Sequence, residues 1–347
     1  MAALETVTGS FAESFQAAAW LTDADELPHT PADAPGWSEN WLTYAWCPGQ
    51  SVGVYFHVCR RPGPIGVYEE TFNVYLPGDR FLTSRGFAPI RDDQGPEVAG
   101  VSFRCQEPYR RWTKRFRGGA RLVTATELWS GPLRDGPVVD VDFEMTIEAM
   151  SPPFDYGAEK LEQSWGTGHY EQHHEVTGRL TYGGETLELR GAGLRDHSWG
   201  PRDWSGIGET TWFHGQFPRS GRSFMVISVP GRPPFERFRY AVLSDRSGVY
   251  RAGVLEAPGA DRVCEAGGSY ELKLANGSDS ITIGVEVLQS MPMTFLAPAE
   301  IGHGIQRRPE ATHDFIENMN RFTWGGEVGY GMVTGCRPRA GFETASS

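Results

Sequence analysis

Strict alternation of apolar and polar side chains is the feature that most constrains how this 347-residue chain can fold. In residues 138–148, VVDVDFEMTIE, a hydrophobic side chain stands at every second position, between acidic or hydroxyl side chains. Residues 51–58 and 281–287 repeat the pattern. A period of two residues gives a strand one buried and one solvated face, which is typical of antiparallel sheet.

Short glycine-containing links separate several of these strand-like runs. YGGE at 182–185 and PRSGRS at 218–223 have the length and composition of tight β turns. Helical patterns are confined to residues 11–21, FAESFQAAAWL, and 311–322, ATHDFIENMNRF. We therefore expect an all-β fold with few short helices.

The length of the chain favours two packed β domains over one small domain. A break in the strand pattern at 155–168 suggests where to divide it. We expect an N-terminal helix and arm over 1–35, a first β domain over 36–160 and a second over 161–347. No repeat at a fixed period is found.

Charge and cysteine content narrow the class of protein. A net charge of −12 argues against a nucleic-acid partner. The basic run at 109–121 could bind an anion, but a solvated strand edge or loop is the simpler expectation. Five scattered cysteines, no basic leader and no long apolar run predict a cytoplasmic protein with reduced thiols and no integral membrane segment.

The stretch GLRDHSWGPRDW at 193–204 is the densest cluster of ionisable and indole side chains. On an extended backbone, the neighbours Asp196 and His197 point in opposite directions, unless the chain turns between them. A loop here could aim one of them inward, with Trp199 and Trp204 as apolar walls. An indole-lined pocket would raise the pKa of the Asp196 carboxyl and make it a proton donor.

The alternative is a structural role for the same residues. Asp196 could pair with Arg202, or Arg195 with Asp203, and clamp a rigid corner. Spacing alone leaves both interpretations open.

A second cluster, HYEQHHEV at 169–176, contains His169, Glu171, His173 and Glu175 on one face of an expected strand. Two imidazoles and two carboxylates are sufficient ligands for zinc or iron. Residues along a strand face are about 6 to 7 Å apart, however, and converge poorly on one ion. A polar strand is the favoured interpretation, with pocket-lining residues or a metal site as alternatives.

Three further segments supply candidate binding residues. GWSENWLTYAW at 36–46 holds Glu39, Trp41 and Tyr44, which form either a cavity wall or a buried strand. His214 and Tyr330 occur in strand-like runs of the second half. Motifs typical of α/β-hydrolases, P-loop enzymes and dinucleotide-binding proteins are missing from the sequence, and no cofactor is expected.

The stretch 193–204, with the preceding HYEQHHEVTGRLTYGGETLELRGAG, resembles the central motif of a lipocalin-like family that includes hydroxyneurosporene synthase (a carotenoid hydratase) and AttH-type domains. SENWLTYAW and WGGEVGYGMVTG resemble the early and closing strands of that family. The resemblance implies two lipocalin-like β domains with an apolar cavity between them, and hydration of isolated isoprenoid double bonds. It implies catalytic positions at Asp196, His197 and Trp199.

Two positions depart from the family pattern. Ser198 replaces a common asparagine, and the glutamate that follows Gly-Tyr-Gly in the family is missing here, where the chain reads Met332, Val333, Thr334.

These observations lead to one hypothesis of catalysis. The chain would be a cofactor-independent hydratase or dehydratase, or a related isomerase or cyclase, acting on a hydrophobic terpenoid-, steroid- or polyketide-like molecule. Asp196 would protonate the alkene, and His197 or Glu39 would direct water. Residues that line the substrate or shield the cation would be Trp199, Trp204, Trp41, Tyr44, His214 and Tyr330.

The rival hypothesis is a lipocalin-type carrier of a hydrophobic molecule without catalysis. A metal-dependent enzyme at 169–175 is a third reading. The sequence leaves the oligomeric state open, with a homodimer among the alternatives.

Overall fold

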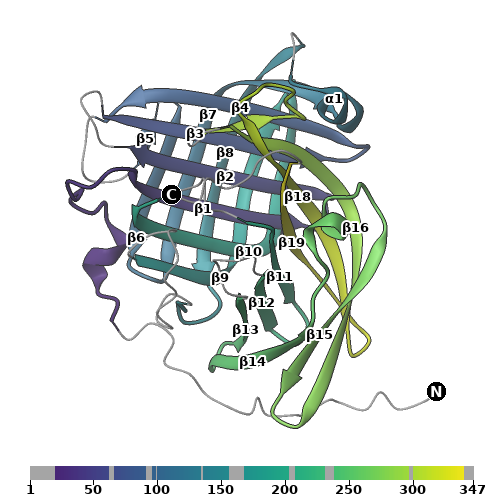
Figure 1. Cartoon of the computed structure of the whole chain (residues 1–347). Coiled ribbons are helices and arrows are strands. Elements are labelled where there is room, and N and C mark those ends of the chain that lie inside the picture. Colours follow the sequence, from purple (N-terminus) through teal and green to yellow (C-terminus); the bar gives the residue numbers. More distant parts are fainter. Residues whose placement is uncertain are drawn as a thin grey trace.

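The computed structural model describes residues 20–61, 66–90, 96–98, 100–133, 136–155, 168–202, 208–230, 238–296 and 300–339. Their regular structure is dominated by antiparallel strands in two sheets, which confirms the expected all-β fold with few short helices (Figure 1). The helix expected over 11–21 lies, apart from its last two residues, outside the described residues.

The first sheet, drawn purple to teal in Figure 1, has the strand order β4-β3-β2-β1-β10-β9-β8-β7-β6-β5. Pairing of β4 with β7 closes eight of these strands into a ring. The strands are β1 (Trp37–Cys47), β2 (Val52–Arg61), β3 (Val67–Leu76), β4 (Arg80–Pro89), β5 (Glu97–Val98), β6 (Val101–Glu107), β7 (Arg111–Thr124), β8 (Val138–Ala149), β9 (Gly168–Tyr182) and β10 (Glu185–Pro201).

The second sheet, green to yellow, has the order β15-β14-β13-β12-β11-β19-β18-β16-β17. Pairing of β15 with β16 closes a second eight-stranded ring. The strands are β11 (Thr210–Phe217), β12 (Arg222–Val229), β13 (Phe238–Asp245), β14 (Gly248–Glu256), β15 (Ser269–Asn276), β16 (Asp279–Leu296), β17 (Glu300–His303), β18 (Ala311–Trp324) and β19 (Glu327–Pro338). Short helices are η1 (Asp23–Glu26), α1 (Ala125–Ser130) and α2 (Ala260–Val263).

Three hydrophobic clusters hold the molecule together. The interior of each closed sheet is filled by its own side chains, as expected for eight-stranded barrels. In the first barrel, the phenyl groups of Phe56, Phe72 and Phe143 pack against one another. A third cluster, which we call the inter-sheet core, joins the outer faces of the two rings. Its members include Leu42, Tyr44, Trp46, Tyr55, Tyr75, Leu194, Met225, Ile227, Tyr240, Met291, Met293, Met319 and Met332.

The two sheets do not divide where the sequence suggested. Strands β9 and β10, which we assigned to a domain starting at residue 161, pair with β8 and β1 in the first sheet. The change of sheet falls between β10 and β11. Residues 156–167, where the break in the pattern lies, are outside the described residues and separate two neighbouring strands.

The helix expected over 311–322 is wrong, because this segment is strand β18. One face of β18 packs inside the second ring and the other packs on the first sheet. Glu317, Asn318 and Asn320 are all buried there. A strand that is buried on both faces loses the alternation by which strands are recognised.

In the basic run 109–121, Arg111, Arg115 and Arg117 form ion pairs with acidic residues of the neighbouring strand β8, so they are part of a solvated strand face. All five cysteines are free thiols. No described helix is long and apolar enough to cross a membrane.

Candidate functional site

The stretch at 193–204 is mainly strand and not loop. β10 continues to Pro201 and pairs with β1 and β9. Gly200 has a φ of 126°, a backbone conformation that glycine adopts without strain, next to the strand end. Trp204 and Asp203 lie outside the described residues.

Neighbouring side chains of β10 point to opposite faces of the sheet, as the sequence predicted for Asp196 and His197. His197 stacks on Trp41 of the first barrel core, with ring centroids 4.8 Å apart. Leu194, two residues before Asp196, belongs to the inter-sheet core. The motif therefore contributes to two separate sites, one inside the first barrel and one between the sheets.

Inside the first barrel, His197 is part of a hydrogen-bond network with the N-terminal segment. Nε2 of His197 lies 3.0 Å from Oε1 of Glu39, and Nδ1 of His29 lies 2.7 Å from the same oxygen. Nδ1 of His197 lies 3.2 Å from the Tyr170 hydroxyl. The His29 ring also stacks on Trp199 at 3.7 Å.

The charged groups of this network stabilise one another. Burial acts to raise the pKa of Glu39, but hydrogen bonds from His197 and His29 outweigh it and hold this pKa at about 2. Arg195 donates to Glu26 and to Gln172, and Tyr170 also donates to Glu26. A carboxylate that accepts several charged or polar donors is typical of a buried structural ion pair.

This network is a clamp, but not the one that spacing suggested. Arg195 pairs with Glu26 of η1, which lies 169 residues earlier in the chain, and Arg202 donates to Ser198. Glu39, Trp41, His197 and Trp199 therefore lie together on the barrel interior, on the opposite face from Asp196.

Between the sheets, Asp196 meets two residues of β9. Its carboxylate lies 2.7 Å from Nε2 of His169, and the same nitrogen lies 3.6 Å from Glu171. One ligand-type atom from each of the three residues lies within 4.8 Å of the others. Asp196 keeps 13% of its side chain exposed, whereas Glu171 is fully buried.

The surroundings of Glu171 disfavour the charged form of its carboxyl group. Burial raises its pKa well above the usual range, and the negative charges of Asp196 and Asp155 add to the effect. Neither of its oxygens has a hydrogen-bond partner among the described residues. The indole N–H of Trp212 is near enough to favour the charged form, but it does not reach hydrogen-bonding geometry.

The same face carries aromatic and acidic groups from both sheets. The Tyr44 ring packs edge-on against Trp212 at 5.5 Å and lies 4.9 Å from His214. The hydroxyl of Tyr44 donates to Glu317 of β18 at 3.0 Å. Burial raises the pKa of Glu317 to about 8, although hydrogen bonds from Thr334 and Tyr44 oppose the shift.

Sequence reasoning missed Glu317 and Trp212. Thr334, on the closing strand β19, lies directly opposite Glu317 on β18. The segment of Glu317 was expected to be helical, so no pattern placed its side chain beside Tyr44.

The remaining predicted residues are distributed around these two sites. Tyr330 stacks on Trp46 at 6.1 Å in the inter-sheet core. The ring of His173 lies 3.0 Å from the Ser244 hydroxyl, and Glu175 pairs with Arg246, so neither converges with His169.

Two sets of described residues have the spacing of metal ligands. They are His29, Glu39 and His197 inside the barrel, and His169, Glu171 and Asp196 between the sheets. The first set already satisfies its nitrogen and oxygen atoms with hydrogen bonds.

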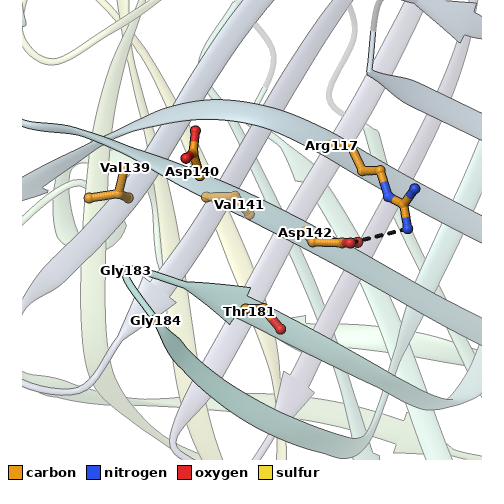
Figure 2. Close-up of a pocket in the computed structure, with 8 residues that line it drawn as sticks. All are labelled: Arg117, Val139, Asp140, Val141, Asp142, Thr181, Gly183 and Gly184. Carbon is orange, nitrogen blue, oxygen red and sulfur yellow. Dashed lines mark ion pairs between the residues drawn. The ribbon is translucent and has the colours of Figure 1, made fainter.

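A surface hollow on the first barrel is separate from both sites. It is lined by residues of β7 and β8 and by the turn Gly183–Gly184, and the Arg117–Asp142 ion pair crosses its wall (Figure 2). That turn is the opposite end of the β9–β10 hairpin from Asp196.

Several solved structures share this fold at low sequence identity. The NE1406 protein of Nitrosomonas europaea, a candidate AttH, has a TM-score of 0.51 and 14% identity over 89% of this chain and 98% of its own. CghA has a TM-score of 0.52 and 13% identity over 88% of each chain. Kievitone hydratase from Nectria haematococca has a TM-score of 0.50 and 12% identity, with 91% and 94% covered.

No curated relative matches the chain in sequence. A family model does match, over residues 22–339, which is most of the chain and includes strands of both sheets. The chain therefore belongs to the family of the domain of unknown function DUF7064.

Proposed function

We propose that this protein is a cofactor-independent hydratase or dehydratase that acts on a hydrophobic molecule bound between the two sheets. The observation that carries the proposal is the fully buried carboxyl of Glu171 beside the Asp196–His169 pair. The fold shared with a kievitone hydratase, and the resemblance of 193–204 to carotenoid hydratases, support the same reaction class.

When two neighbouring carboxyl groups have different environments, one can act as a general acid and the other as a general base. Asp196 is hydrogen-bonded to His169 at 2.7 Å, while burial raises the pKa of Glu171 well above its usual range and favours its protonated form. The two carboxyl groups and the His169 imidazole lie within 4.8 Å of one another, and Asp196, the more exposed of the two acids, is the one placed to deliver a proton to an alkene carbon. General acid catalysis of this kind contributes about 10²- to 10⁴-fold.

The face around Asp196 suits a carbocation better than it suits water. Tyr44 and Trp212 present aromatic rings, which attract a positive charge. Apolar residues of the inter-sheet core surround them and would exclude water from the cation until it is needed. Isomerisation or cyclisation would follow from the same cation if no water were admitted.

Replacing Asp196 by Asn tests the proposal. We expect turnover of a panel of isoprenoid alkenes and tertiary alcohols, followed by a mass change of one water, to fall at least about 10²-fold. The melting temperature should change little, because Asn keeps the shape and can still accept a hydrogen bond from His169. Asp140→Asn, on the exposed side of β8, is the matched control.

A carrier function is the second candidate, and one feature favours it. Five methionines line the inter-sheet core, and methionine adapts to ligands of varied shape. A carrier would bind the same panel without turnover, and Asp196→Asn would leave its dissociation constants unchanged. Loss of several kcal/mol of stability in Asp196→Asn would instead identify a purely structural ion pair.

A further inference from the structure

Glu317 connects the second sheet to the face that carries Asp196. Its Oε2 accepts a hydrogen bond from the Thr334 hydroxyl at 2.7 Å, from the neighbouring strand β19. Its Oε1 accepts one from the Tyr44 hydroxyl at 3.0 Å, from the first sheet. The carboxyl is fully buried. It therefore lies on the surface of the second sheet that faces β1 and β10 of the first sheet. We call these two facing sheet surfaces the two walls.

Asp196 and the Glu317–Tyr44 pair lie near each other. Asp196 pairs in register with Leu42, and Leu42 and Tyr44 face the inter-sheet core from the same side of β1. Burial raises the pKa of the Tyr55 hydroxyl, and the negative charges of Glu317 and Asp196 raise it further. Tyr55 lies opposite Tyr44 on the neighbouring strand β2, and its side chain belongs to the inter-sheet core.

The carboxyl groups on the two walls have different surroundings. Burial brings the pKa of Glu317 to about 8, so this carboxyl carries its proton at pH 7. Asp196 is hydrogen-bonded to an imidazole at 2.7 Å. Elimination of water requires one group that gives a proton to the leaving oxygen and a second group that takes a proton from carbon.

We propose that Glu317 is a second catalytic acid–base group, which exchanges a proton with the substrate oxygen while Asp196 exchanges one with the adjacent carbon. This inference rests on the proposed function. In dehydration, Glu317 gives its proton to the hydroxyl as the C–O bond breaks and water leaves. Asp196 takes a proton from the neighbouring carbon, and the C–H electron pair forms the double bond. Hydration is the reverse, and no oxidant or reductant is needed.

Infrared spectroscopy with and without a tertiary alcohol tests whether Glu317 contacts the ligand. The probes are hydroxycitronellol, linalool and α-terpineol. We expect a protonated-carboxyl band that is lost near pH 8, moves when an alcohol binds, and is missing from Glu317→Gln. Glu286→Gln, which removes an exposed ion pair with Arg321 on the same sheet, is the matched control and should keep the band.

Kinetics separates a catalytic role from a structural one. Glu317→Gln should lower kcat for alcohol dehydration about 10²-fold, with a less than threefold change in dissociation constant. Thr334→Val keeps the carboxyl but removes a donor that favours its charged form, so the limb of the pH profile near 8 should move upward.

The outcomes that contradict each proposal are distinct. Alcohol binding without a shift of the Glu317 band, or wild-type kcat in Glu317→Gln, would overturn the role of Glu317 alone. A wild-type protein that neither binds nor dehydrates any of the three alcohols would count against the proposed function itself, and with it against this inference.

Discussion

Glu171 and Asp196 are neighbours on paired strands, yet their surroundings differ in one decisive respect. Asp196 has a hydrogen-bonded imidazole, and Glu171 is buried without a hydrogen-bond partner among the described residues. A buried polar group without a partner destabilises a fold, so natural proteins keep one where it has a function. The unfavourable placement of Glu171 is itself an argument for catalysis.

Replacing Glu171 by Leu should therefore separate stability from activity. Leu has a similar volume and no polar atoms to bury without a partner, so we expect the free energy of unfolding to rise by about 1 to 3 kcal/mol. Turnover should be lost. Chemical denaturation and the product assay measure the two effects.

Glu188→Leu, at an exposed position of β10, is the control and should change stability by less than about 0.5 kcal/mol. If Glu171→Leu destabilised the protein by several kcal/mol, Glu171 would be a structural residue whose partner lies elsewhere.

Sequence reasoning could predict which way residues point, but not which residues they meet. Period-two geometry sufficed to separate Asp196 from His197 and to align His169 with Glu171. The residues that meet at these sites come from distant parts of the chain: Glu26, which pairs with Arg195, comes from η1, and Glu317, which pairs with Tyr44, comes from β18. Strand alternation carries no information about such long-range contacts.

At the scale of elements, the segment from Trp20 to His29 is fastened to the first barrel by charge. Glu26 is buried against Arg195, and His29 joins Glu39, which also accepts from Arg60. The Trp20 indole donates to Asp155 at 3.0 Å. Both faces of β10 are thus used, because its inner face anchors this segment while its outer face carries Asp196.

Glu39→Gln should loosen this segment in a pH-dependent way. The folded-state pKa of Glu39, about 2, is below its ordinary value of 4.5. Its charge therefore stabilises the fold above about pH 4.5, and this contribution is lost as the pH falls towards 2. We expect Glu39→Gln to cost about 3 kcal/mol at pH 7, with the difference from wild type shrinking between pH 4.5 and 2.

Thermal melts across this pH range, with limited proteolysis near residues 20–30, measure both effects. Glu175→Gln, which removes only an exposed ion pair with Arg246, is the matched control. A constant difference between wild type and Glu39→Gln over the whole range would show that Glu39 is not charged in the fold.

The strands themselves were predictable where one face is wet and not where both are buried. β8 and the hairpin turns at 183–184 and 218–221 matched their patterns. β18 did not, because the second barrel covers one of its faces and the first sheet covers the other. The candidate site lies where the sheets meet, so Glu317 of β18 could not be found from the sequence pattern, although Asp196 and His169 could.

At the scale of the whole molecule, polar contacts as well as apolar packing join the two barrels. The Tyr75 hydroxyl donates to the Glu317 carbonyl at 3.1 Å, and Gln289 donates to the Leu76 carbonyl at 2.7 Å. The face of β9 also contacts the second sheet, through His173 and Ser244. A site built from both walls requires this coupling, because either barrel alone would expose its half of the inter-sheet core to water.

We therefore expect the protein to unfold in one cooperative transition, with equal calorimetric and van't Hoff enthalpies. Met225 is fully buried in the inter-sheet core, and Met225→Glu would place a charge there. This substitution should lower the single melting temperature and reduce stability by about 3 kcal/mol or more. Val138→Glu, at an exposed position of β8, should leave it unchanged. Two melting transitions, of which Met225→Glu lowers only one, would show that the barrels are independent domains. A site shared between independent domains would lack the rigid frame that acid–base catalysis across two walls needs.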